Sequence, residues 1–301
     1  MPSLNDLLWG LVAPLFAAAG LRLVLAFLSD WLFARPVDKD STSGDAAPAK
    51  RVLAWETCLP LALGAGLGYF FLPLGPWVPE VEYEWIAAAV GLAVVASTVV
   101  GFLGNHWSAR FIGLPIFYAA TAVAVGYALM PTWDDLWPDY RTYLVFWCLG
   151  AWLLSVAIDQ SSLPASWPFA IVVLGTCLAT SGVVLLSESM RFAQISGLTV
   201  GVVLGLTVVG LILRRPLLNG LGLPIVVYLG GMLLIAQTNS FSEVPFLCYW
   251  LPMGGLLLAV VTGQLVSRTS FPKLHATSMI LAAAIPSTVA VIMAVVATMP
   301  E

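Results

Sequence analysis

The chain has 301 residues, of which 60% are hydrophobic and only 9% are charged, and its formal net charge is −4. Soluble domains carry roughly 25% charged residues, so this composition excludes a soluble globular protein. The sequence contains no basic run of the kind that binds nucleic acid, so no nucleic-acid partner is expected. The lipid bilayer is the expected surrounding of the chain.

Inside a bilayer the backbone polar groups must be satisfied within the protein, which leaves helices or a closed β-barrel. The apolar runs are close to the roughly 20 residues of a membrane helix and do not alternate as barrel strands do. The sequence therefore predicts an all-α, polytopic integral membrane helix bundle. Ten transmembrane spans are expected, at residues 7–33, 52–73, 85–103, 111–130, 142–159, 168–187, 194–213, 221–238, 246–266 and 275–297.

The connections between these spans are short, which indicates a single transmembrane domain over residues 1–301 without a soluble domain. The longest connection, residues 34–51, is rich in Ser, Asp, Ala and Pro. Such a composition cannot bury a core, so we expect a flexible cytoplasmic loop.

Lysine and arginine gather on one side of the predicted spans, and the positive-inside rule makes this the cytoplasmic side. The basic residues on that side are Arg35, Lys39, Lys50, Arg51, Arg110, Arg214, Arg215, Arg268 and Lys273, whereas the other side has only Arg141 and Arg191. With ten spans, both termini are then expected to be extracytoplasmic. The plasma membrane is the expected location.

Charged residues inside the predicted spans are candidate functional residues, because ionisable groups at membrane depth are costly. Arg22 lies about 20 Å from the cytoplasmic end of the first span, too deep for its side chain to reach water alone. Glu56 lies at a reachable height on the next, antiparallel span, so we expect an Arg22–Glu56 ion pair. Asp159 is the second choice of partner. The pair is expected either to fix two helices or to line a path for an ion or substrate.

The seventh span carries glycines at four-residue spacing, Gly197, Gly201 and Gly205. Small residues at this spacing let two membrane helices approach closely. The contact is expected either within the bundle or with a partner, which would be a second copy of the chain or another membrane subunit.

Two of the last spans contain interior prolines, Pro252 and Pro286, and each is followed by small residues: Gly254 and Gly255 in one span, Ser287 in the other. Interrupted helices in transporters expose backbone carbonyls that coordinate ions or substrates. We interpret these positions either as such helix breaks or as ordinary kinks.

The predicted outer loop that follows the fourth span contains Asp134, Asp135 and Asp139. Three carboxylates are suitable ligands for a divalent cation, and a lipid-facing enzyme could use one. Neighbouring aromatic residues are also typical of a solvated loop at the membrane surface. The chain contains no catalytic motif and no metal-ligand spacing, so no metal and no cofactor are predicted.

Three functions agree with these features. The preferred one is a transporter-like protein for a small solute or cation, for which a water-filled cavity should reach Arg22. A non-catalytic scaffold or subunit of a larger membrane complex should instead have a solid core, with the glycine face towards lipid or a partner. A lipid-facing enzyme is the least favoured and requires the acidic outer loops to converge on a cleft.

Overall fold

The computed structural model describes residues 4–33, 54–72, 74–75, 78–103, 109–130, 137–187, 189–239, 242–266 and 272–299. Over these residues the secondary structure is helical and contains no strand. Nine of the described helices are long and apolar enough to cross a membrane. The predicted fold class is confirmed: the chain is a multi-pass, all-α membrane bundle.

The helices follow the predicted spans closely. They are α2 (Ala13–Phe33), α3 (Trp55–Phe71), α4 (Ile86–Leu103), α5 (Leu114–Leu129), α6 (Trp137–Gln160), α7 (Trp167–Leu186), α8 (Met190–Leu213), α9 (Gly222–Asn239), α10 (Phe246–Val266) and α11 (Pro272–Ala297). Short turns precede several of them: α1 (Leu4–Leu7), η1 (Leu8–Val12), η2 (Glu82–Trp85), η3 (Ala109–Gly113) and η4 (Leu163–Ala165). Helix α3, which is not among the nine, has 17 residues and extends about 26 Å.

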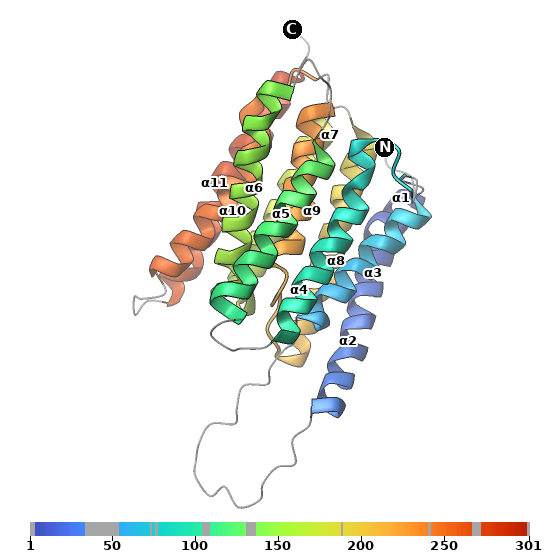
Figure 1. The fold of residues 1–301 in the computed structure, drawn as a ribbon, viewed down its shortest axis with the longest axis vertical. Coiled ribbons are helices and arrows are strands. Elements are labelled where there is room, and N and C mark those ends of the chain that lie inside the picture. The colour runs from blue at the N-terminus through green and yellow to red at the C-terminus, as the bar shows by residue number, and fades with distance from the viewer. Residues whose placement is uncertain are drawn as a thin grey trace, which may run out of the picture.

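Successive long helices run antiparallel, so their ends gather at two opposite ends of the bundle (Figure 1). The linker end holds residues 214–221, which join α8 to α9. The terminal end is where α1 begins and α11 finishes. Both ends of the described chain therefore lie on one side of the bundle, as an even number of antiparallel long helices requires. Which of these ends faces the cytoplasm, and in which membrane, stays a prediction.

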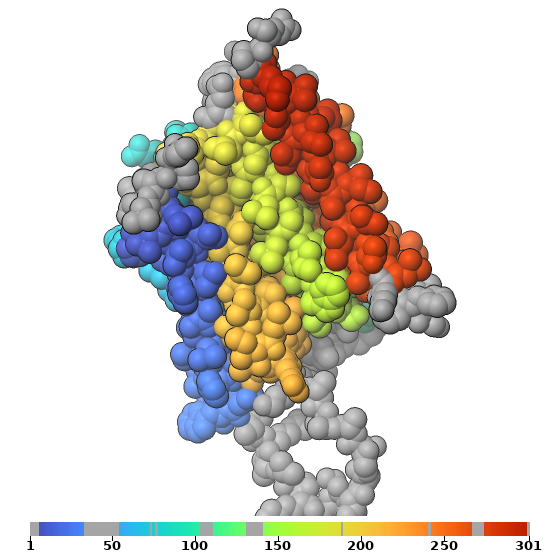
Figure 2. Space-filling view, turned by 180° about the vertical axis from the view of Figure 1, so that it is seen from behind, coloured from blue at the N-terminus to red at the C-terminus, as the bar shows by residue number. Residues whose placement is uncertain are grey.

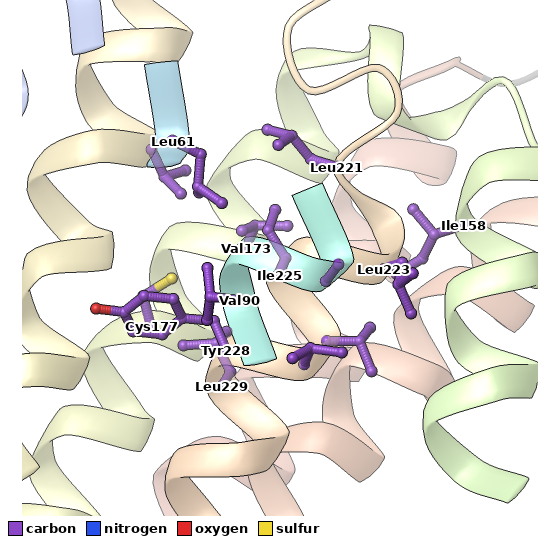
Figure 3. Close-up of a cluster of buried hydrophobic side chains, with 14 of the residues drawn as sticks. Leu61, Val90, Ile158, Val173, Cys177, Leu221, Leu223, Ile225, Tyr228 and Leu229 are labelled. Carbon is purple, nitrogen blue, oxygen red and sulfur yellow. The ribbon is translucent and has the colours of Figure 1, made fainter. Parts of the chain in front are cut away.

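Helix α9 is the centre of the bundle and packs against α4, α5, α6, α7, α8 and α10. Apolar residues surround α9 on all sides, which is typical of a helix buried on every face, and 89% of its membrane window is buried. Figure 3 shows Ile225 and Tyr228 of α9 among Leu61 of α3, Val90 of α4 and Val173 of α7. Helices α2, α8, α7 and α11 lie side by side across one face (Figure 2).

The glycine face of α8 packs inside the molecule, against the first membrane helix. A methyl group added at Gly201 or Gly205 would overlap the backbone carbonyl oxygens of Leu11 and Leu15, respectively. A methyl group at Gly197 would meet nothing within 4 Å. Two of the three glycines therefore make the close approach of α2 and α8 possible, whereas the third does not.

We expect Gly205→Ala to lower the free energy of unfolding by about 1–3 kcal/mol, because the carbonyl of Leu15 can move only if α2 moves. Gly197→Ala on the same helix is the matched control, and alanine should there be neutral or should stabilise by up to about 1 kcal/mol. Titration with sodium dodecyl sulfate in detergent micelles measures both changes. Equal losses in the two variants would contradict the assigned α2–α8 contact.

Candidate functional site

The guanidinium of Arg22 lies at the linker end of α8 and is completely buried. Its Nη1 donates to the carbonyl oxygens of Leu206 and, at 2.7 Å, Leu217, and its Nη2 donates to that of Pro216 at 2.5 Å. Gly210 leaves room for the guanidinium, because a methyl group there would lie 2.9 Å from Nη1. Arg22 thus supplies a positive charge near the carboxyl end of α8 and donors for the carbonyl groups of the linker that follows it.

The predicted Arg22–Glu56 ion pair is wrong, because Glu56 pairs with Arg215. Glu56 Oε2 accepts a hydrogen bond from Arg215 Nη1 at 2.8 Å, and Arg215 Nη2 lies 2.6 Å from Asp30 Oδ1. Arg215 Nη2 also donates to the carbonyl oxygen of Ala26 at 3.2 Å. The physical reason is the path of residues 214–221, which fold back against α2 and α3 and bring Arg215 to the buried carboxylate.

We call Arg22, Asp30, Glu56 and Arg215 the linker clamp. Its two arginines and two carboxylates sum to zero formal charge, and Glu56 and Arg22 are fully buried. Arg22 Nε and Glu56 Oε1 have no hydrogen-bond partner among the described residues. A neutral set of charges, three of its four members buried, that ties α2 and α3 to the linker is suited to holding helices in place.

Helix α3 holds the rest of the linker through its first turn. Thr57 Oγ1 donates to the carbonyl oxygen of Asn219 at 2.5 Å, and Cys58 Sγ donates to that of Gly220 at 3.2 Å. Gly220 has a φ of +76°, and a methyl group there would lie 2.5 Å from the Cβ atom of Ala54. Glycine is therefore required both for the left-handed turn and for the close packing of the linker.

Asp159 does not join Arg22 but caps the beginning of α9. Its Oδ1 accepts from the backbone N–H of Gly222 at 3.1 Å, and its Oδ2 accepts from the hydroxyl of Tyr118 at 2.6 Å. That hydroxyl lies 3.3 Å from Ser97 Oγ. A carboxylate at a helix amino end satisfies free N–H donors and interacts favourably with the helix dipole. Asp159 thereby fixes α9 to α5 and α6.

Of the two interpretations of the interior prolines, the helix break is not found, because α10 continues through Pro252 and α11 continues through Pro286. Neighbouring helices in a membrane bundle can accommodate an interior proline without interrupting the helix. A methyl group at Gly255 would lie 2.9 Å from the carbonyl oxygen of Ala283, so α10 and α11 cross closely there. Ser287 is buried beside this crossing, and its Oγ has no partner among the described residues.

A pocket of about 530 Å³, which we call the lateral pocket, lies over α9 between α6 and α10. Leu233 and Leu234 of α9 form its buried floor. Gly150 of α6 and Gly254 of α10 line its sides. Leu257 of α10 is 43% exposed at its margin. Because α6 and α10 hardly touch each other, the pocket opens sideways from the bundle, where the bilayer would surround it.

Gln237 and Trp250 form the polar end of the lateral pocket. The indole Nε1 of Trp250 donates to Gln237 Oε1 at 3.1 Å. An indole nitrogen can only donate, so this contact fixes which side-chain atom of Gln237 is oxygen. Among the described residues, the Nε2 group of Gln237 has no acceptor. The other residues of the pocket are mainly apolar, and Pro286 of α11 is one of them.

Two predicted regions cannot be placed. Asp134 and Asp135 and the predicted loop 34–51 lie outside the described residues, and of Asp139 only the backbone, in the first turn of α6, is described. The hypothesis of an acidic outer site therefore stays a prediction.

No protein-family model matches the chain, and no curated protein or solved structure matches it either. The functional conclusion rests on the geometry of the linker clamp and the lateral pocket.

Sequence reasoning missed the role of Arg215 and the Gln237–Trp250 pair. The sequence did contain a signal that Arg215 is buried. The residues that follow it, 216-PLLNGLGLP-224, are too apolar for a solvated loop, which indicates a connection packed against the helices. No comparable signal marks the pairing of Gln237 with Trp250, because it depends on how α9 and α10 pack.

Proposed function

We propose that the protein binds a largely apolar molecule that enters sideways from the bilayer, and that it acts as a transporter-like protein for that molecule. The lateral pocket is the observation that carries the proposal. Its volume of about 530 Å³ lies within the roughly 300–1,000 Å³ typical of small-molecule sites. Its opening between α6 and α10 faces the surrounding lipid rather than either end of the bundle.

The length of the pocket suits a lipid chain. Its floor on α9 runs from Val226 to Gln237, a rise of about 16 Å at 1.5 Å per residue. One leaflet of a bilayer provides about half of the roughly 30 Å hydrocarbon core. A chain of one leaflet could therefore lie along the floor over its whole depth.

Two features favour an apolar solute over a hydrated cation. Arg22, the charged residue deepest in its helix, is fully buried and donates to backbone carbonyls, so it does not line a wet path. Within the described part of the chain, no charged residue lines the lateral pocket and could replace the hydration shell of an ion. These features support a transporter-like function, but for an apolar or amphipathic solute.

A non-catalytic subunit of a larger membrane complex is the second candidate. The closed packing around α9 favours it, because a solid core suits a structural role. The glycine face of α8 does not favour it, since Gly201 and Gly205 are already covered by the first membrane helix.

The proposal is tested by the movement of a fluorescent phosphatidylcholine across vesicles that contain the purified protein, with dithionite quenching as the readout. Gly254→Phe should slow this movement at least about tenfold, which corresponds to about 1.4 kcal/mol in the barrier. A Cβ atom at Gly254 meets nothing within 4 Å, and Gly254 lines the pocket, so a side chain can be introduced there beside the proposed path.

Gly175→Phe is the matched control, because Gly175 on α7 is also free of contacts within 4 Å and lies away from the lateral pocket. This variant should move lipid at the wild-type rate. Transport is excluded if the wild-type protein gives no faster movement than protein-free vesicles. The pocket is excluded as the path if both variants behave alike.

A further inference from the structure

We infer that the lateral pocket holds a lipid whose neutral hydrogen-bond acceptor, the carbonyl of an acyl ester, lies at Gln237. This inference rests on the proposed binding of an apolar molecule in the same pocket and names its chemical class.

The orientation of the Gln237 amide leaves its N–H donors available to a bound molecule. Trp250 Nε1 can only donate, so the atom that it contacts at 3.1 Å must be Gln237 Oε1. The two N–H donors of Nε2 then lack an acceptor among the described residues. Donors without partners are costly next to hydrocarbon, because no water replaces the missing acceptor. An acceptor on the bound molecule would satisfy them.

The Gln237–Trp250 pair lies at the depth in the bundle where lipid ester groups are expected. Gln237 lies two residues before the end of α9, and Trp250 lies in the second turn of α10, so both are at the terminal end. Tryptophan is enriched at this depth, where the hydrocarbon of a bilayer meets its polar layer. The ester groups of glycerolipids occupy the same layer. A lipid with its ester at Gln237 would extend its chain along the floor towards Val226, in the direction of the bilayer centre.

The uncharged lining of the lateral pocket favours a neutral acceptor at Gln237. Among the residues that the structure describes, no Asp, Glu, Lys, Arg or His lines the lateral pocket. An anionic group at Gln237 would lack a counter-charge and would meet the carbonyl end of α9, where the helix dipole is negative. A neutral acceptor avoids both penalties. The carbonyl of an ester therefore fits better than a free carboxylate or a phosphate.

The test compares two phosphatidylcholines with identical chains, one ester-linked and one ether-linked, because only the ester provides a carbonyl acceptor. Each lipid competes with a photoreactive alkyl probe for labelling of the purified protein in micelles. The wild-type protein should bind the ester lipid about three- to tenfold more tightly, as expected for one hydrogen bond. Gln237→Met should abolish this preference and leave the affinity for the ether lipid unchanged.

Two further variants keep the test decisive. Trp250→Phe removes the indole that orients the Gln237 amide, so the preference for the ester should weaken. Gln264→Met, at the linker end of α10 and outside the pocket, should keep the preference. Loss of the preference in Gln264→Met as well would overturn the assignment to Gln237.

The failure of this inference and the failure of the proposed function give different results. Equal affinity of the wild-type protein for the two lipids overturns the ester inference, while competition by both still supports the pocket. Absence of competition by either lipid, together with unchanged probe labelling in Gly254→Phe, overturns the proposed function itself.

Discussion

Arg22→Met is expected to lower the free energy of unfolding by about 3–5 kcal/mol, because it removes a buried charge together with the hydrogen bonds that the charge makes. Methionine fills a similar volume, so lost packing contributes little. The linker carbonyl oxygens of Pro216 and Leu217 would lose the guanidinium as their donor. Titration of the purified protein with sodium dodecyl sulfate in micelles measures the loss.

Two variants show whether the effect comes from these contacts. Arg214→Met makes the same chemical change on an exposed arginine at the end of α8 and should stay within about 0.5 kcal/mol of the wild type. Arg22→Lys keeps the charge but lacks the planar fork of donors, so its loss should be intermediate. If Arg22→Met unfolds as easily as Arg214→Met, the carbonyl contacts do not stabilise the bundle.

The second large effect is expected from Glu56, whose replacement leaves Arg215 paired only with the half-exposed Asp30 among the described residues. Glu56→Gln alone should cost about 3–5 kcal/mol, since the linker clamp then holds two buried arginines and a single carboxylate. In an Arg215→Met background the same change should cost much less. A double-mutant cycle should therefore give an interaction energy of at least about 1.5 kcal/mol between the two residues.

A second cycle with Arg22→Met in place of Arg215→Met discriminates between the two arginines. Glu56 contacts Arg215 directly at 2.8 Å, whereas Arg22 donates to backbone carbonyls, so the coupling with Arg22 should be the smaller one. A larger coupling with Arg22 would show that the ion pair predicted from sequence forms in the protein.

The helices were predictable because the thickness of the bilayer sets their length and the absence of water requires their backbone hydrogen bonds. The predicted span 221–238 became α9, Gly222–Asn239, and the predicted span 246–266 became α10, Phe246–Val266. For such elements a local hydrophobic run is sufficient information, and the tertiary structure adds little to their boundaries.

The contacts within the candidate site were less predictable. The Arg22–Glu56 pair was predicted by comparing the heights of the two residues along their helices. This comparison assumes that loops lie outside the membrane region, but residues 214–221 fold back against α2 and α3 and bring Arg215 to Glu56. The spacing of Gly201 and Gly205 indicated a close contact, but not that α2 would be the partner. The lateral pocket arises because α6 and α10 hardly touch, which depends on the packing of the whole bundle.

The contacts of Arg22 also have a consequence for how the chain is made. Its acceptors at Leu206 and Leu217 lie 184 and 195 residues further along the chain. At about 5–20 residues per second, a ribosome needs about 10–40 s to produce them after Arg22 itself. During that interval α2 lies in the bilayer before the acceptors of its guanidinium exist. Insertion measurements give the free-energy cost of an arginine at the centre of a membrane helix as about 2.5–3.5 kcal/mol. Helix α2 can therefore reach its final contacts only after α8 and the linker have been synthesised.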